Sequence, residues 1–176
     1  MEQSKYLGIY SSTDRKYKTY GRTSHGTKAI PIIEQLNPSS ILDVGCGWND
    51  FITDIKRLLP DTRAVGVDFA CPGADIIADV TIQLPFTEAE FDIATSFDVL
   101  EHLVPNDVNH ALNEIRRVSR RFVFSICYRD SVNRWMGLTL HPTIRPQEWW
   151  VEQIRCAGAE NISIVGKYIT GTWTAH

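Results

Sequence analysis

The sequence lacks the features that mark membrane-spanning, secreted and zinc-stabilised proteins. Its cysteines form no C-x-x-C pair and have no histidine at ligand spacing, so neither a zinc site nor a disulfide framework is indicated. No stretch approaches the ~18 consecutive apolar residues of a membrane span, and the amino-terminal residues contain no apolar segment of the signal-peptide type. We therefore expect a soluble protein of the reducing cytoplasm, with no membrane partner and no bound metal.

The sequence also lacks a strong excess of charge of either sign. Its formal net charge of -3 argues against a broad polyphosphate-binding surface, although a local basic patch is compatible with that value. The chain has 176 residues, of which 43% are hydrophobic and 22% charged. These values are typical of one globular domain with a real core.

The order of apolar runs predicts the fold class. Residues 1–24 are polar and rich in tyrosine and show no period, so we expect a flexible arm that can cover a site. In residues 25–176, apolar runs typical of buried strands alternate with amphipathic helices, and residues 128–145 form a long loop. We predict strands near 40–44, 63–68, 75–79, 91–97, 121–127, 161–165 and 167–173, and helices near 27–36, 50–59, 106–118 and 146–156. This pattern predicts an α/β fold: one doubly wound Rossmann-like domain with a mostly parallel seven-stranded sheet whose last strand is antiparallel.

The turn after the first strand, in 41-ILDVGCGWNDF-51, is the strongest local signal. Gly45 and Gly47 allow a tight turn and the close approach of a ligand to the backbone. A dinucleotide-binding turn needs a third small residue at position 50, where Asp50 stands, and a carboxylate there would repel a pyrophosphate. We expect Asn49 to adopt a left-handed conformation and to cap the next helix. Asp43 and Asp50 together favour a cationic ligand.

The segment 41-ILDVGCG-47 resembles the first motif of the class I S-adenosylmethionine-dependent methyltransferases. The further landmarks of that family follow in order, as 65-VGVD-68, 78-ADV-80 and 91-FDIATSFDVLEHL-103, and the resemblance covers about residues 40 to 127. It implies S-adenosylmethionine as the cofactor and S-adenosylhomocysteine as the product. It also implies that the protein is an enzyme that transfers a methyl group.

The resemblance assigns roles to individual residues. Asp68, at the end of the second strand, would accept hydrogen bonds from the ribose hydroxyls. Asp43 would receive the ammonium group of the cofactor, while Asp79 and the Val80 amide would face the adenine and Phe69 would cover its ring. The expected cofactor-binding residues are Tyr20, Asp43, Gly45, Cys46, Gly47, Asp68, Phe69, Asp79, Val80, Phe97, Asp98 and His102.

A general base is needed only when the acceptor is a hydroxyl or a protonated amine. The catalytic candidates are His141, His25 and Tyr128, because each stands in a segment that can reach the carboxyl ends of the strands. The basic run 116-RRVSRR-121 joins a helix to the amino end of a strand, so we expect it to stabilise the fold on the opposite edge of the sheet.

The sequence narrows the class of acceptor without identifying it. The fourth predicted strand does not lead into the D/N-P-P-Y/F turn of nucleic-acid amino-methyltransferases, and no Pro-Cys nucleophile follows it. We therefore expect transfer to an O or N atom of a small, anionic or sugar-containing acceptor. Two alternatives stay open: a nucleic-acid methyltransferase that uses the basic residues of the arm, and a non-catalytic cofactor-binding partner or regulatory subunit. The oligomeric state is not predicted.

Overall fold

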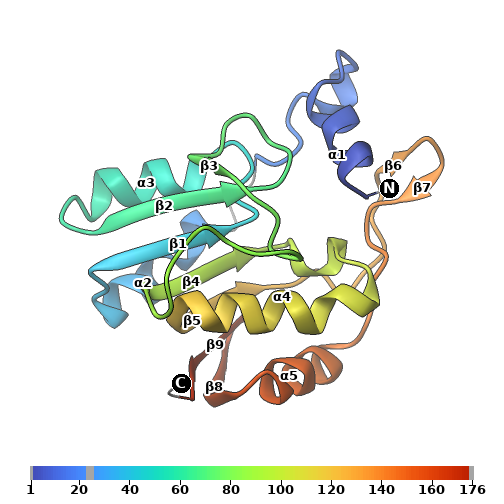
Figure 1. Cartoon of the computed structure of the whole chain (residues 1–176). Coiled ribbons are helices and arrows are strands. Elements are labelled where there is room, and N and C mark those ends of the chain that lie inside the picture. Colours follow the sequence, from blue (N-terminus) through green and yellow to red (C-terminus); the bar gives the residue numbers. More distant parts are fainter. Residues whose placement is uncertain (1, 23–25, 175–176) are drawn as a thin grey trace.

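A seven-stranded sheet forms the centre of the protein in a computed structural model that describes residues 2–22 and 26–174 (Figure 1). The helices are α1 (Glu2–Tyr10), α2 (Ile30–Leu36), α3 (Asp50–Leu58), α4 (Pro105–Val118) and α5 (Gln147–Cys156), with short 3-10 helices η1 (Arg15–Tyr17), η2 (Thr27–Ala29) and η3 (Leu100–His102). The strands are β1 (Ser40–Val44), β2 (Arg63–Asp68), β3 (Ile76–Ile77), β4 (Phe91–Phe97), β5 (Ser119–Ser125), β6 (Arg134–Trp135), β7 (Leu138–Thr139), β8 (Ala159–Val165) and β9 (Tyr168–Trp173).

The strand order of the main sheet is β3-β2-β1-β4-β5-β9-β8. The strands from β3 to β5 pair in parallel, whereas β9 is antiparallel to both of its neighbours. This topology confirms the predicted doubly wound α/β fold with an antiparallel last strand. The chain order reverses at β1, and in such sheets ligands bind beyond the carboxyl ends of the strands at that point.

The two faces of the sheet are covered by different helices. Strand β1 is buried along its whole length. Its Ile41 packs in a cluster with α2 and α3, while the next residue, Leu42, packs in a cluster with α4 and α5. Successive side chains of a strand point to opposite faces, so an unbroken apolar strand requires a layer on each side.

Strand β5 begins and ends two residues earlier than the sequence predicted. The reason is that α4 runs directly into it: Ser119 Oγ donates to the Ile115 carbonyl at 2.7 Å, and the backbone of Ser119 is already extended. The basic run beside this junction stabilises the fold as expected. Arg117 pairs with Glu114 and donates to the carbonyls of Leu84 and Phe86.

The amino-terminal arm differs from its prediction, because it carries α1 and η1. Tyr6, Ile9 and Tyr10 stand at helical spacing on α1. Two of these three apolar contacts come from tyrosine rings, so the polar composition of the arm did not indicate an amphipathic helix. Tyr6, Ile9 and Tyr17 are buried against Leu140.

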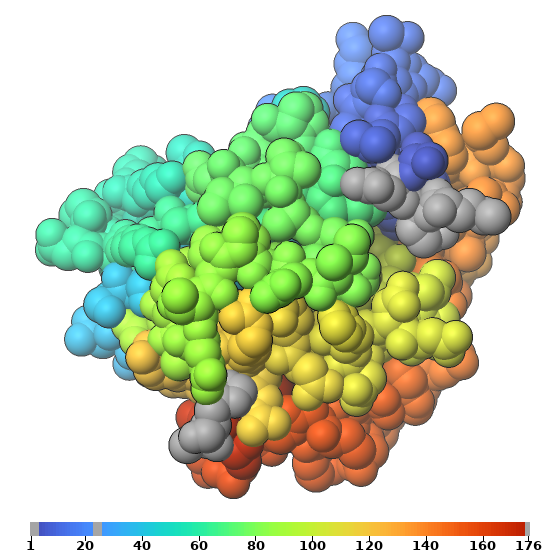
Figure 2. Space-filling view, in the orientation of Figure 1, coloured from blue at the N-terminus to red at the C-terminus, as the bar shows by residue number. Residues whose placement is uncertain are grey.

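The arm packs against the segment 128–145, which contains the hairpin β6–β7 rather than a plain loop. The Tyr17 hydroxyl donates to the Arg134 carbonyl, and the Tyr17 and Trp135 rings meet edge to face. In the space-filling view the blue arm and the orange hairpin lie side by side (Figure 2). Among the described helices, none has the length and apolar content needed to cross a membrane.

Candidate functional site

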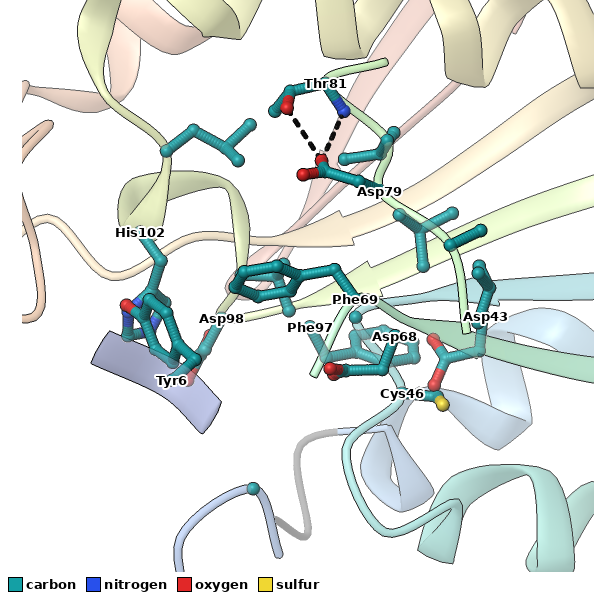
Figure 3. Close-up of a pocket in the computed structure, with 18 of the residues that line it drawn as sticks. Tyr6, Asp43, Cys46, Asp68, Phe69, Asp79, Thr81, Phe97, Asp98 and His102 are labelled. Atoms are coloured by element: carbon teal, nitrogen blue, oxygen red, sulfur yellow. Dashed lines mark hydrogen bonds between the residues drawn. The ribbon is translucent and has the colours of Figure 1, made fainter. Parts of the chain in front are cut away.

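A cavity of about 170 Å³ lies at the carboxyl ends of β1, β2 and β4, and Tyr6 and Tyr10 of α1 also line it. Figure 3 shows Tyr6 beside His102 and Phe69. Every residue that the sequence analysis named for cofactor binding lines this cavity, with the exception of Gly47. Side chains that come from three separate strand ends therefore converge on one space. The sequence analysis did not anticipate the contribution of α1.

The glycine turn is shaped by two close approaches. Gly45 has φ +77°, and a Cβ there would overlap the side chain of Val99. Gly47 has φ +53°, and a Cβ there would overlap the carbonyl oxygen of Gly21. The second close approach explains why Gly47 does not face the cavity: its open side is filled by the arm. Glycine is the residue that tolerates both the positive φ and the contact.

Asn49 is the N-cap residue of α3 and adopts the predicted left-handed conformation, with φ +65°, but its side chain makes no capping hydrogen bond. The side chain turns instead toward β2, where the absence of a side chain at Gly66 makes room for the Oδ1 atom. The position of the cap is therefore as predicted, whereas the side chain packs against β2 and does not bond to the helix end. Asp50, the first residue of α3, lines the cavity and pairs with Arg22 of the arm at 2.8 Å.

Asp43 is a buried carboxyl group at the end of β1, with 4% of its surface exposed. Thr95 Oγ1 of the neighbouring strand β4 donates to its Oδ1 at 2.7 Å. Burial raises the pKa of Asp43 to about 7; the hydrogen bond from Thr95 opposes this rise, and the nearby Asp68 adds to it. This acid is therefore only partly ionised near neutral pH and would favour a cation beside it.

Asp68 ends β2 and holds the loop around the cavity. Its Oδ1 accepts from the amides of Ala70 and Cys71 at 2.9 and 2.8 Å, and its Oδ2 accepts from the Gly47 amide at 3.1 Å. A carboxylate offers about four lone-pair directions, so both oxygens keep acceptor capacity toward the cavity. These backbone donors fix the carboxylate before any ligand arrives.

The region after β3 supplies another fixed acid. Asp79 Oδ1 accepts from the amide and the hydroxyl of Thr81, at 2.8 and 2.7 Å. Phe69 and Val80 also line the cavity. An acid and a flat aromatic ring in the wall of one cavity suit a planar heterocycle carrying an amino group.

The opposite end of the cavity is formed by the residues after β4. Asp98 has φ +56°, and its backbone is held by Ser125 of β5: the Asp98 amide donates to the Ser125 carbonyl at 2.8 Å. Ser125 Oγ also donates to Asp98 Oδ1 at 2.7 Å. A non-glycine residue in this conformation is strained, and such strain is found mainly where the surrounding structure enforces it at functional sites.

Aromatic rings from the arm cover the cavity. Tyr6 meets Phe69 edge to face with ring centroids 5.3 Å apart, and Tyr20 meets Tyr10 at 5.7 Å. Burial is the largest cause that raises the pKa values of Tyr10 and Tyr20, so both phenols stay neutral. The spacing of the tyrosines in 6-YLGIY-10 was the available signal for this cover, and the sequence analysis did not use it.

The three catalytic candidates have different positions. His141 lies behind the cavity wall, and its ring meets the cavity-lining His102 edge to face at 4.6 Å between centroids. Tyr128 packs against the core cluster on the α4 and α5 side and does not line the cavity. His25 lies outside the described residues.

The fold and the cavity together define a structural class: a doubly wound α/β protein with acidic side chains around a ligand cavity, at the point where the strand order reverses.

Residues 42–122 match the family model described as a methyltransferase domain. The chain is 30% identical over 124 residues to the demethylmenaquinone methyltransferase of Roseiflexus sp. (strain RS-1), a match that covers 64% of this chain and 49% of that protein. The corresponding protein of Roseiflexus castenholzii is 33% identical over 91 residues, which cover 45% of this chain and 37% of that protein. The matches thus span about half, or less, of these relatives.

Solved structures share the fold. The Burkholderia thailandensis 1,6-didemethyltoxoflavin-N1-methyltransferase, with bound 1,6-didemethyltoxoflavin and S-adenosylhomocysteine, has a TM-score of 0.73 at 18% identity, over 98% of this chain and 87% of that chain. Human N-acetylserotonin methyltransferase in complex with SAM has a TM-score of 0.66 at 12% identity, over 99% of this chain and 57% of that chain. Residues 42–122 thus match a methyltransferase domain, and the chain shares the fold of these solved methyltransferases.

Proposed function

We propose that this chain binds S-adenosylmethionine in the cavity and transfers its methyl group to a small molecule. The observation that carries the proposal is the charge of the cavity wall. Asp43, Asp68 and Asp79 line it, and no lysine or arginine side chain of the described residues does. A sulfonium cofactor suits such a wall, whereas the pyrophosphate of a dinucleotide does not.

Each acid has a separate part of the cofactor to bind. Asp68, fixed by three backbone amides, would accept from the ribose hydroxyls. Asp79 and Phe69 would hold the adenine, and Asp43 would attract the ammonium group. Gly45 lines the cavity beside these acids, and its missing Cβ leaves room for Val99, which also lines the cavity. Bound S-adenosylmethionine would supply a methyl group that is already activated for displacement.

The protein's own task would be to position the acceptor and exclude water. The aromatic cover formed by Tyr6, Tyr10 and Tyr20 suits both tasks, since it closes the cavity with rings that can stack on a flat molecule. The names of a relative and of a structural neighbour refer to demethylmenaquinone and to 1,6-didemethyltoxoflavin. We therefore propose a small acceptor with a conjugated ring and an O or N methylation site. Among the described residues, the cavity lining includes no lysine or arginine that would favour an anionic acceptor.

Isothermal titration calorimetry tests the cofactor proposal. S-Adenosylmethionine and S-adenosylhomocysteine should bind in the micromolar range, and NADH should not compete with them. Asp68→Ala should weaken this binding at least about tenfold, because a charge-assisted hydrogen bond contributes roughly 1.5–3 kcal/mol. Asp61→Ala, which removes an exposed acid, serves as the matched control. No heat with either adenosyl ligand would refute the cofactor proposal.

A methyl-label transfer screen tests the acceptor class. Labelled cofactor is incubated with separate pools of small metabolites and nucleic acids, and we expect label in the metabolite pool only. Label in nucleic acid, lost when Arg15, Lys16 and Lys18 are neutralised and steeply reduced by salt, would favour a nucleic-acid methyltransferase instead. Binding of cofactor without transfer to either pool would favour a non-catalytic partner protein.

A further inference from the structure

Glu101, His102 and His141 bring three metal-ligating side chains together behind the cavity. One potential ligand atom from each residue lies within 4.8 Å of the other two. Glu101 and His102 belong to η3, which follows β4, whereas His141 follows β7. The hydrogen bond from the Thr143 amide to the Glu101 carbonyl, at 3.2 Å, ties the two segments together. The cluster is therefore a product of the tertiary fold.

Hydrogen bonds define which nitrogen of each ring can bind a ligand. His141 Nδ1 lies 2.7 Å from the Arg129 carbonyl, and a carbonyl can only accept, so Nδ1 carries the proton and Nε2 keeps its lone pair. The Tyr6 hydroxyl donates to the Leu140 carbonyl at 3.2 Å and lies 2.7 Å from His102 Nδ1. The Tyr6 hydroxyl thus orients the His102 ring through Nδ1.

These contacts resemble the supporting shell of a metal site. A ligating histidine in proteins donates its other ring N–H to a carbonyl or another acceptor, which orients the ring and fixes its tautomer.

Glu101 supplies an independent observation. Its side chain is fully buried, with 0% of its surface exposed. Its Oε1 accepts from the Cys127 amide at 3.0 Å, but its Oε2 has no hydrogen-bond partner among the described residues. A buried carboxylate oxygen without a partner is costly, and coordination of a cation is one way to satisfy it.

We propose that Glu101, His102 and His141 bind a divalent first-row transition-metal ion beside the cavity. Two imidazoles and one carboxylate suit Zn²⁺, Fe²⁺ or Co²⁺ and leave coordination positions open. His102 also lines the cavity, so an open position can face the acceptor and hold its oxygen or nitrogen atom. That role toward the acceptor rests on the proposed function, whereas metal binding itself does not. The cysteine spacing that argued against a zinc site carried no information about this cluster.

Titration of the chelator-treated full chain with Co²⁺ tests the inference. The visible absorption of bound Co²⁺ reports its ligands directly, and competition with Zn²⁺ gives the relative affinity. We expect one equivalent of Co²⁺ to bind, and we expect His141→Gln and Glu101→Gln each to weaken binding at least tenfold. The matched controls are His110→Gln on α4 and Glu160→Gln on β8, both exposed, which should bind as the wild type does.

Two outcomes would overturn the inference: no binding of Co²⁺ or Zn²⁺ by the wild type, or equal binding by all of these variants. Equal binding would place the ion outside this cluster. S-Adenosylhomocysteine is titrated into the same samples, and His141→Gln should retain its affinity for that ligand. Metal binding that depends on the cluster, without any binding of adenosyl ligands, would refute the proposed function and leave the metal site standing.

Discussion

Asp43 carries an unfavourable contribution to folding that a ligand can offset. Its pKa is 3.8 in an unperturbed side chain and about 7 in the folded protein, mainly because of burial. Between these two values the unfolded chain has released the proton and the folded chain still holds it. This group therefore makes the free energy of unfolding fall as the pH rises from about 4 to about 7, with no further change above that.

The same carboxyl group predicts the pH dependence of cofactor binding. If the ammonium group of S-adenosylhomocysteine lies beside Asp43, the ligand favours the ionised form and binding releases a proton. The affinity should then rise roughly tenfold from about pH 5.5 to about pH 7, as the ionised fraction of Asp43 increases. Calorimetry in two buffers of different ionisation enthalpy measures both the affinity and the released proton. Asp43→Asn should abolish the slope, and a persistent slope in that variant would place the titrating group elsewhere.

Gly47 and Gly137 both have positive φ, but we expect an alanine substitution to reduce the free energy of unfolding more at Gly47 than at Gly137. Gly47→Ala should destabilise the protein by about 2–4 kcal/mol, since it adds a left-handed alanine and a clash with the Gly21 carbonyl. Gly137→Ala is the matched control, because Gly137 has φ +82° at the tip of the β6–β7 hairpin with nothing within 4 Å of the added Cβ. It should cost only about 1–2 kcal/mol. Urea denaturation measures both, and equal losses would mean that the arm does not press on the glycine turn.

Helix α1 forms its own small core with the segment that follows β7. Ile9 is 1% exposed in this cluster, which is separate from the two clusters that cover the main sheet. Ile9→Ala should therefore open the arm locally, with faster hydrogen exchange in residues 2–22 and much less change in β1, β4 and β5. Leu7→Ala on the same helix is the control, because Leu7 is 49% exposed. Uniformly faster exchange across the sheet after Ile9→Ala would show that α1 belongs to the main core.

The main sheet could be predicted because each of its central strands is an apolar run that can be recognised from the local sequence. The apolar runs at β1, β2 and β4 are buried on both faces, so composition and length were sufficient to locate them. The residues around the cavity could be predicted where they follow these strands directly. Asn49 was predicted only in part. Its left-handed conformation could be predicted from its residue type, but its packing against Gly66 of β2 could not.

The remaining features depend on contacts between distant segments. The cluster of Glu101, His102 and His141 forms only when the segment after β7 folds back onto η3. Helix α1 has a weak apolar side made of tyrosines, and its burial depends on the hairpin it packs against. The tyrosine spacing on α1 indicated an apolar side but not the partner of that side, and nothing local indicated the contact of His141. The arm was therefore predicted to be flexible, and His141 was placed in a loop. Contacts between segments far apart in the sequence determine both the position of α1 and the position of His141.

The carboxyl ends of the strands and the arm together enclose the cavity, so a ligand there contacts both the main sheet and α1. S-Adenosylhomocysteine that binds the folded chain alone should stabilise it by about 2.7 kcal/mol at a concentration of 100 times Kd. For a chain of this length that corresponds to a rise in Tm of roughly 5–10 °C.

Differential scanning calorimetry, combined with hydrogen exchange, measures this coupling. The rise in Tm should be small for Asp68→Ala at the same ligand concentration, and NADH should produce none. Because Tyr6 and Tyr10 line the cavity, the ligand should also slow exchange in α1, which the apo protein protects only through its own small cluster. A rise in Tm without slower exchange in α1 would mean that the ligand contacts the strand ends alone, and that the arm acts on the acceptor and not on the cofactor.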